Sequence, residues 1–506
     1  MSKTPNAEHK QEPANGSDIL DVAIIGAGIS GINTAYRIQT ELPDINYAIF
    51  EARDTIGGTW DFFKYPGLRS DSDLFTFGFS WRPWTKNNPI ADAGSILEYL
   101  RTSTTMEGID NHIQFNTRIQ KANWSVKSHL WELTATTNNG VQHQSFARFL
   151  VLGTGYYDYE QALPVIIPRL DSFEGQTVHP QFWPADLDYT DKRVVCIGSG
   201  ATAITLVPVL AQKAASVTML QRSPSYIISI SNSSKVSRLK QYLPKRLAYI
   251  LNRLYFLTFP ILFYYFCRLF PTLSRNTIRK AATKQLPEGY PMDPNFTPRY
   301  NPFDQRVCFA PDGDFYDAIR KGAKIVTGTI KQVVGDGILL DDGSKLSADI
   351  VITATGLKML WGGKISITVD GKPYRIGDKL AWHNAMLQDL PNAMVVTGYV
   401  MASWTLGADA TAFLLCRLLR GMRKHGLSTI VPRVPTDGSV KACPLITLSS
   451  TYVLAAAADS LPKCGSQGPW RRRFNYFTDT LKFKYGDVTE DLELYRENLP
   501  VTGLKL

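Results

Sequence analysis

The sequence predicts an α/β fold with two Rossmann-like dinucleotide-binding domains and a helical insertion. Two glycine-rich turns carry this prediction. Residues 26–31 and residues 198–203 each follow a short apolar run and open an apparent helix. Apolar runs of this kind are typical of parallel strands that are buried on both faces. A chain of 506 residues is also long enough for two or three domains with large cores.

The charge of the chain points to anionic partners. A formal net charge of +10 suits nucleic acid, an anionic membrane surface or anionic cofactors. The Lys and Arg residues are spread along the chain, apart from a loose cluster at 235–284, and no nucleic-acid motif accompanies them. We therefore expect no nucleic-acid partner and favour cofactor phosphates, with a membrane surface as a further candidate.

The cysteines and the N-terminal stretch indicate a cytoplasmic protein. The six cysteines are dispersed, without a C-x-x-C pair or a zinc spacing, so we expect reduced thiols and no metal site. Residues 1–17 are polar and lack the apolar core of a signal peptide, so a disordered tail is expected there. Nothing in the sequence indicates the oligomeric state.

The first turn lies between two predicted strands. Asp21 to Ile25 is an apolar run, the turn opens a helix through Ile38, and the second strand, Tyr47 to Phe50, ends at an acid. The glycines permit a close approach of the backbone to a pyrophosphate, and the acid is placed to bind a ribose, which suits the adenosine of FAD. The residues expected to contact this first nucleotide are Gly26, Gly28, Ser30, Gly31 and Glu51.

The second turn follows the strand Arg193 to Ile197 and precedes the strand Val217 to Leu220. No acid ends that second strand. Arg222 stands near its end, and a cation there favours the 2′-phosphate of NADPH. The alternative for Arg222 is a solvated loop arginine. The residues expected to contact NADPH are Gly198, Ser199, Gly200, Thr202, Ala203, Gln221, Arg222 and Ser223.

Other segments complete the two domains. Residues 114–151 alternate as in a β-meander, and Gly153-Thr154-Gly155 ends that run. Asp349 to Gly356 reads as a buried strand and a glycine link that returns the chain to the first domain. A helix is predicted from Thr411 to Met422.

A fingerprint stretch lies just before the second turn. It reads F-x-G-x-x-x-H-x-x-x-W-P and consists of Phe173, Gly175, His179, Trp183 and Pro184. This pattern resembles that of type I Baeyer–Villiger monooxygenases, the class B flavin enzymes. The resemblance implies FAD and NADPH as cofactors and insertion of one atom of O₂ beside a ketone through a C4a-peroxyflavin, giving an ester or lactone. It also implies that His179 and Trp183 couple NADP to closure of the site. A lone His is more often a structural residue.

A second stretch, Gly57 to Asp71, matches the pattern [AG]-G-x-W-x-x-x-x-[FY]-P-[GM]-x-x-x-D of the same family. The resemblance implies that Gly58, Thr59 and Trp60 belong to the flavin site. It implies further that Asp71 is an active-site carboxylate near the flavin. The alternative for Asp71 is a helix N-cap or an ordinary loop acid.

From Asp21 to Trp470 the chain resembles one branch of that family, the ethionamide-activating FAD-containing monooxygenases. By this resemblance Arg306 is the catalytic arginine, held by Asp71. Gln305 stands where most Baeyer–Villiger enzymes have Lys, so more of the phosphate recognition is expected to fall on Arg222. The alternative for Arg306 is a structural salt bridge.

An apolar run, Leu254 to Cys267, lies inside the insertion and is flanked by Arg253 and Arg268. It is too short for a spanning helix of about 20 residues. Two readings stay open for 254–267: a helix that covers the active site, and a peripheral contact with a membrane surface.

The expected division of the chain is a disordered tail at 1–17, an FAD-binding domain at 18–165 and 358–506 (with the C-terminal region), an NADPH-binding domain at 166–231 and 299–357, and the helical insertion at 232–298. The expected function is oxygen insertion into a small-molecule ketone, in secondary-metabolite tailoring or elsewhere. The alternatives are S- or N-oxygenation of a substrate such as a thioether, and a flavoprotein that does not oxygenate. A disulfide reductase would need a cysteine pair beside the flavin, and the sequence has none.

Overall fold

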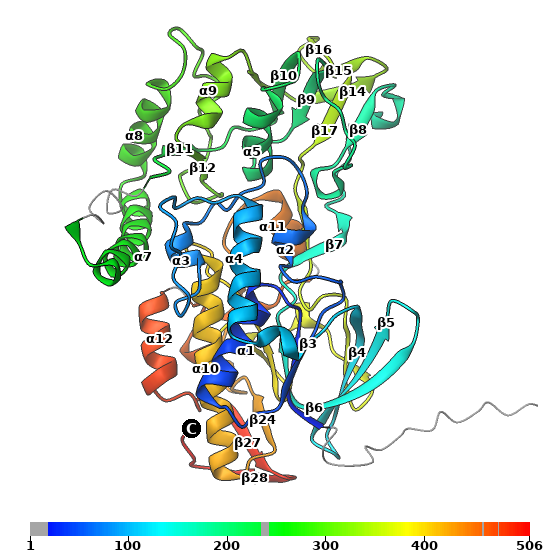
Figure 1. Ribbon diagram of the computed structural model, residues 1–506, viewed down its shortest axis with the longest axis vertical. Helices are drawn as coiled ribbons and strands as arrows, with labels where there is room; N and C mark the ends of the chain where they lie inside the picture. Colours follow the sequence, from blue (N-terminus) through cyan, green and yellow to red (C-terminus); the bar gives the residue numbers. More distant parts are fainter. Residues whose placement is uncertain (1–18, 234–241, 458–459, 474) are drawn as a thin grey trace, which may run out of the picture.

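The computed structural model describes residues 19–233, 242–457, 460–473 and 475–506. The tail expected at 1–17 lies outside these residues. The predicted fold class is confirmed, because two units with parallel sheets lie one above the other along the long axis of the molecule (Figure 1). We call them the first unit and the second unit, in the order in which the chain enters them.

The first unit is built on a nine-stranded sheet. Its parallel part places β1 between β2 and β6, with Ile24 opposite Ile49 on one side and Val151 on the other. The apolar side chains of these strands are buried because helices and a second layer of strands cover both faces. The strands of this sheet are β1 (Ile19–Ile25), β2 (Tyr47–Phe50), β3 (Ile113–Gln114), β4 (Thr117–Ser125), β5 (Leu130–Thr137), β6 (Gln142–Leu152), β19 (Ser366–Val369), β20 (Lys372–Pro373) and β23 (Ala393–Val395).

Helices cover this sheet. The helix predicted from Thr411 to Met422 lies within the longer α10, which packs against α1 and ends at Gly426 in the left-handed conformation (φ 61°). The helices of the first unit are α1 (Ile29–Glu41), α2 (Thr59–Phe62), α3 (Leu74–Phe77), α4 (Ala93–Met106), α10 (Trp404–His425) and α12 (Tyr476–Tyr485). Its small strands are β21 (Ala381–Trp382), β22 (Met386–Leu387), β24 (Thr429–Pro432), β27 (Leu492–Arg496) and β28 (Leu499–Val501).

The second unit has a five-stranded parallel sheet in the order β13-β10-β9-β17-β8. Its strands are β8 (Gln176–Val178), β9 (Arg193–Ile197), β10 (Ser216–Gln221), β13 (Lys324–Thr327) and β17 (Ile350–Thr353). The helices α5 (Ala201–Leu210) and α9 (Asp314–Arg320) pack against each other beside it. An antiparallel sheet of β14 (Ile330–Val334), β15 (Gly337–Leu340) and β16 (Lys345–Ser347) extends the unit.

A connecting region lies between the two units. There β7 (Tyr157–Ala162) pairs with β18 (Leu357–Met359), and α11 (Thr451–Ala457) packs against β18. The pair β25 (Ala442–Pro444) and β26 (Lys463–Gly465) lies at the base of the segment that contains α11. Cys443 and Cys464 are opposite each other in this pair, as free thiols.

The helical insertion projects from one side of the second unit. It contains α7 (Lys245–Leu269) and α8 (Pro271–Thr283) and is followed by β12 (Cys308–Pro311), which pairs with β11 (Ile227–Ile230). The run 254–267, which is itself too short to cross a membrane, lies within a longer helix. Arg246–Leu269 is long and apolar enough by length and composition alone, with a mean hydropathy of 1.3 over an 18-residue window. The difference arises because the helix continues for several residues before Leu254.

Candidate active site

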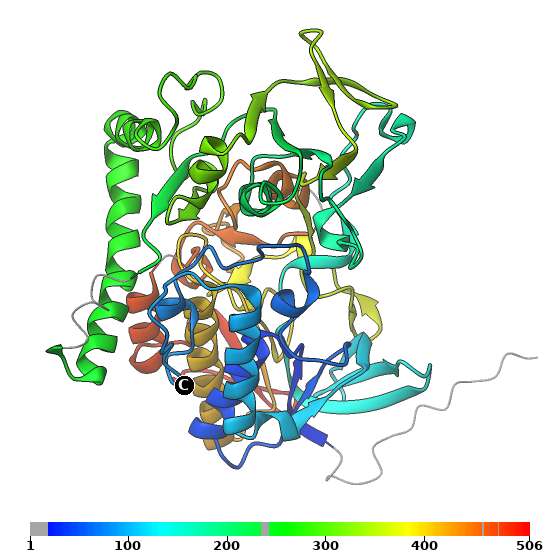
Figure 2. The ribbon, with the colours of Figure 1, turned by 45° about the horizontal axis from the view of Figure 1, so that its top comes forward.

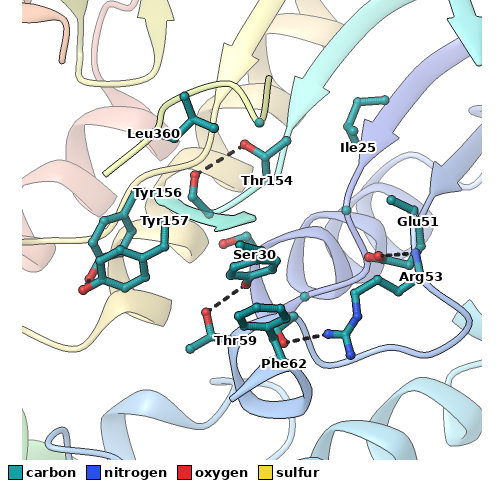
Figure 3. Close-up of a pocket in the computed structure, with 18 of the residues that line it drawn as sticks. Ile25, Ser30, Glu51, Arg53, Thr59, Phe62, Thr154, Tyr156, Tyr157 and Leu360 are labelled. Carbon is teal, nitrogen blue, oxygen red and sulfur yellow. Dashed lines mark hydrogen bonds between the residues drawn. The ribbon is translucent and has the colours of Figure 1, made fainter. Parts of the chain in front are cut away.

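A cavity of about 450 Å³ opens at the carboxyl ends of β1, β2 and β6. Its wall runs from Glu51 and Arg53 at one side to Tyr156 and Tyr157 at the other (Figure 3). The residues on this wall that the sequence predicts for the flavin site are Gly26, Gly28, Ser30, Glu51, Gly58, Thr59 and Trp60. The structure therefore gathers two separate sequence motifs around one cavity.

The first glycine turn is packed too closely for side chains. Gly26 has a φ of +102°, and a Cβ on it would lie 2.8 Å from the carbonyl oxygen of Gly153. A Cβ on Gly31 would lie only 1.9 Å from the carbonyl oxygen of Gly26, so Gly31 serves the packing of α1 and is not on the cavity wall. No side chain caps the N-terminus of α1, so its first N–H groups suit a pyrophosphate.

Glu51 holds the turn and also lines the cavity. Its carboxylate accepts hydrogen bonds from the backbone N–H of Ala27 (2.7 Å) and of Arg53 (3.0 Å). Burial raises the pKa of Glu51, and these hydrogen bonds oppose the shift. The acid at the end of β2 is thus fixed in place by the backbone on both sides of it.

Several residues on the cavity wall do not belong to the set that the sequence predicts for the flavin site. The guanidinium of Arg53 pairs with the carboxylate of Asp61. Trp404, at the start of α10, donates from Nε1 to Oγ of Ser30 (2.8 Å), and Tyr156 stacks on Trp404 with ring centroids 4.7 Å apart. The contacts of Trp404 join segments far apart in the chain, so no local motif predicts them.

The second glycine turn repeats the pattern with one difference. Gly198 has a φ of +141°, and a Cβ there would lie 2.3 Å from the carbonyl oxygen of Ala354. A Cβ on Gly200, in contrast, would meet nothing within 4 Å. The N-terminus of α5 has no side-chain cap. Open space above an uncapped helix N-terminus fits the pyrophosphate of a second nucleotide.

The residues after β10 divide into a structural and an exposed group. Gln221, predicted to contact NADPH, is buried instead, and its Nε2 donates to the carbonyl oxygen of Asn295 (2.8 Å) and to Oγ1 of Thr327 (2.9 Å). Arg222 is exposed, with Nη2 lying 3.5 Å from Oγ1 of Thr451.

Oγ of Ser199 donates to the carbonyl oxygen of Ser223 (2.8 Å), which closes the turn. Ala203 is buried, whereas Thr202 is half-buried at the start of α5.

Asp71 and Arg306 come together near the tyrosine end of the cavity, but not as an ion pair. Among the described residues, no ion pair within 4 Å joins the two, so the expectation that Asp71 holds Arg306 is wrong for this structure. Asp71 is exposed at its surface, yet desolvation of its carboxyl by the surrounding chain raises its pKa, and the charges of Arg69 and then Arg306 oppose that shift. Nε of Arg306 donates instead to Oη of Tyr452 (3.0 Å).

Arg306 is exposed, and its guanidinium is charged at any working pH. Tyr452, and then Tyr156 and Tyr157, raise its pKa further. Burial likewise raises the pKa of Tyr156, and the charges of Arg306 and Asp71 also act on it. Because Tyr156 and Tyr157 belong to the cavity wall, the structure places a permanent cation beside one end of the cavity.

The fingerprint stretch lies away from the cavity, at β8 and its exit. A Cβ on Gly175 would lie 2.4 Å from the carbonyl oxygen of Asp349, so this glycine lets the chain pass close to β17. Nδ1 of His179 accepts from the backbone N–H of Gln181 (3.1 Å), and burial lowers the pKa of His179, which the nearby Gly356 backbone opposes. Phe173, Trp183 and Pro184 belong to the same part of the second unit, where Phe173 and Trp183 pack on its two cores.

Comparisons with known proteins agree with this geometry. Residues 20–362 match the family described as flavin-binding monooxygenase-like. The FAD-containing monooxygenase EthA of Mycolicibacterium smegmatis is 45% identical over 475 residues, which cover 93% of this chain and 96% of the relative. EthA of Mycobacterium tuberculosis is 42% identical, with the same coverage of 93% and 96%. The crystal structure of OTEMO in complex with FAD and NADP has a TM-score of 0.72 at 20% identity, over 96% of this chain and 100% of that one, which shows a common fold.

Proposed function

Because the chain belongs to the flavin-binding monooxygenase-like family, as a flavin-dependent monooxygenase with FAD and NADPH as its cofactors, we propose that it carries out a Baeyer–Villiger oxidation. One atom of O₂ would be inserted beside the carbonyl of a small-molecule ketone, giving an ester or lactone. The observation that carries this proposal is the permanent cation of Arg306, which lies close to Tyr156 and Tyr157 on the wall of the flavin cavity. A ketone carbonyl develops negative charge when a peroxide attacks it, and a fixed cation stabilises that charge.

The first cavity fits FAD. Gly26, Gly28 and the uncapped start of α1 would hold its pyrophosphate, and Glu51 would bind its ribose. Bound there, FAD would supply the redox chemistry, accepting a hydride from NADPH and activating O₂. The protein supplies binding, orientation and charge. Tyr156, Tyr157 and Trp404 wall the end where Arg306 lies, and their apolar rings would limit water beside the reacting groups.

The second glycine turn fits NADPH, with Arg222 as the partner of the 2′-phosphate. We expect Arg222→Ala to raise the KM for NADPH about tenfold or more, because a hydrogen bond between charged groups is lost. The KM for NADH should change little, since NADH lacks that phosphate. Steady-state kinetics with both nucleotides measure the two values. Arg375→Ala, at an exposed arginine elsewhere, is the matched control and should change neither. Equal effects of Arg222→Ala on NADPH and NADH would remove Arg222 from the phosphate site.

S- or N-oxygenation is the alternative chemistry. A sulfur or nitrogen lone pair attacks the peroxide directly, so no carbonyl oxyanion forms and no cation is needed to stabilise one. Matched pairs of ketones and thioethers, given to the purified holoenzyme with NADPH and analysed by mass spectrometry, compare the two. The proposal expects ester or lactone products with a higher kcat/KM than sulfoxides. Sulfoxides alone would assign the enzyme to heteroatom oxygenation.

We also propose that α7 contacts an anionic membrane surface, on an otherwise cytoplasmic protein. The outer side of α7 carries large apolar residues at helical spacing, which we call the apolar stripe: Leu247, Ile250, Leu251, Leu254, Tyr255, Phe259, Leu262, Tyr265 and Leu269. All of them are exposed, and α7 lies along the outer edge of the molecule (Figure 2). Arg246 precedes the stripe, Arg268 lies just before its last residue, and the net charge is +10. Apolar residues with flanking cations suit the headgroup boundary of an anionic bilayer.

Contacts on the inner side of α7 favour a helix that lies on the membrane surface over one that crosses the membrane. Phe256 stacks on Phe75 with ring centroids 5.3 Å apart, and Leu257 is buried against Tyr399 and Leu406. Nη1 of Arg253 donates to the carbonyl oxygen of Phe75 (2.7 Å). These contacts keep α7 on the body of the protein, close to the start of α10.

A flotation assay with anionic phosphatidylglycerol vesicles tests this contact. The test variant changes Leu254, Phe259 and Leu262 to Ser, at side chains that are 45%, 50% and 65% exposed. We expect wild type to float and this variant to stay in the dense fraction, because each lost apolar side chain removes about 1.5–3 kcal/mol of burial. The control changes Met106, Ile166 and Leu499 to Ser, at sites off the helix that are 64%, 94% and 71% exposed, and should float. Equal flotation of wild type and the α7 variant would contradict the proposal.

A further inference from the structure

A short segment of the first unit contacts Arg222 and Arg306, the two arginines of the second unit with predicted roles. We call residues 449–452 the arginine-facing segment. Ser449 donates from its backbone N (2.9 Å) and from Oγ (3.1 Å) to the carbonyl oxygen of Asp304, two residues before Arg306. Thr451 lies 3.5 Å from Arg222, and Tyr452 accepts the hydrogen bond of Arg306 at 3.0 Å. The segment thus touches the predicted phosphate partner and the predicted catalytic cation side by side.

The segment is anchored in the first unit, beside the flavin cavity. Leu448, Val453, Ala456 and Leu461 are buried in the same core as strands β1 and β6. The strands β25 and β26 pair with each other and so bring together the two ends of the longer stretch, 445–462, that contains the segment. A Cβ on Gly356, in the return crossing, would lie 3.9 Å from Cβ of Tyr452. Tyr452 is therefore fixed to the flavin-binding unit, while the arginine it holds belongs to the other unit.

The hydrogen bond to Tyr452 orients Arg306 without neutralising its positive charge. Arg306 uses Nε to reach Tyr452, and within the described part of the chain it makes no other hydrogen bond. Both Nη groups thus stay available for a developing oxyanion. A carboxylate at the same place would orient the guanidinium but also neutralise it. A neutral hydroxyl orients it and leaves its full charge for the reaction.

We infer that Tyr452 is a positioning residue that aims the Arg306 guanidinium at the reacting carbonyl. This inference rests on the proposed function, since it acts through Arg306. The Tyr452 hydroxyl accepts from Nε of Arg306, and this contact fixes the plane of the guanidinium fork. The resemblance to known enzymes names Asp71 as the residue that holds the arginine, whereas the structure assigns that contact to Tyr452.

Tyr452→Phe tests the inference, because it removes only the hydroxyl. We expect FAD content and the rate of flavin reduction by NADPH to stay within about twofold of wild type. Product formed per NADPH consumed should fall about five- to tenfold, with the balance released as hydrogen peroxide, on the scale of one lost hydrogen bond. The control is Tyr374→Phe, whose hydroxyl donates to the carbonyl oxygen of Gln388 (2.6 Å) in the same core, and whose yield should not change.

A double-mutant cycle separates positioning from general damage. Lys at position 306 keeps the charge but has no Nε group for Tyr452, so Tyr452→Phe should cost nothing further in an Arg306→Lys background. A full additive loss there would overturn the inference, as would a Tyr452→Phe enzyme with wild-type yield. If Arg306→Ala lowers the yield and Tyr452→Phe does not, only this inference fails. If Arg306→Ala keeps the wild-type yield, the proposed function fails as well.

Discussion

Arg306→Ala is expected to lower oxygen insertion about a hundredfold or more while the enzyme still binds FAD and is still reduced by NADPH. A loss of that scale is usual when one well-placed electrostatic group is removed from an active site. Reduction should persist because hydride transfer needs neither Arg306 nor Tyr452, and neither glycine turn is changed. The reduced flavin would then consume O₂ and release hydrogen peroxide. Stopped-flow absorbance measures reduction, and product per NADPH measures insertion.

Two further variants test whether the loss is specific to the guanidinium of Arg306. Arg306→Lys should recover little, because an ammonium keeps the charge but lacks the planar fork and the Nε donor to Tyr452. Arg268→Ala is the matched control, since Arg268 lies nearby but pairs with Asp304 at 2.7 Å. It should leave product per NADPH unchanged. An Arg306→Ala enzyme with wild-type yield would show that Arg306 is structural.

Gly31→Ala is expected to weaken FAD binding by about 5- to 150-fold, on the scale of the 1–3 kcal/mol that overpacking costs. Its Cβ would lie 1.9 Å from the carbonyl oxygen of Gly26, so the start of α1 must move away from the turn. That movement is resisted because α1 packs against α10. The purified variant should carry little flavin, measured by absorbance at 450 nm and by titration with FAD.

Gly200→Ala is the control for that experiment. A Cβ on Gly200 meets nothing within 4 Å, so the variant should fold and keep a full complement of FAD. Its effect should fall on NADPH instead, as a raised KM, because the methyl group enters the space that the second pyrophosphate would use. Normal flavin content in Gly31→Ala, or loss of FAD in Gly200→Ala, would contradict the assignment of the two turns.

Local motifs explain why much of the fold could be predicted. The strand Tyr47 to Phe50 and the turns at Gly26 and Gly198 depend on short-range rules: apolar runs, glycines at positive φ and an acid at a strand end. These rules place Glu51 on the cavity wall before any packing is known. The same rules assign Gln221 to the NADPH site, although its amide is buried. The partners that hold this amide, Asn295 and Thr327, lie far along the chain and are not part of any local motif.

Contacts between distant segments could not be predicted in this way. Arg306 and Tyr452 are 146 residues apart, and their hydrogen bond exists only because α11 is anchored in the first unit's core. The expected ion pair of Arg306 with Asp71 also depends on packing between distant segments, which the sequence does not show. The sequence likewise shows that 254–267 is apolar, but only the fold shows that Phe256 faces inward while Phe259 is exposed.

Oxygen-18 labelling tests the central claim most directly. The holoenzyme is given NADPH, a ketone and ¹⁸O₂, and the products are analysed by mass spectrometry alongside the NADPH consumed. Baeyer–Villiger oxidation predicts an ester or lactone that carries one ¹⁸O atom, with the carbonyl oxygen unlabelled and close to one product per NADPH. Consumption of NADPH with only labelled hydrogen peroxide, across ketones that bind, would contradict the account.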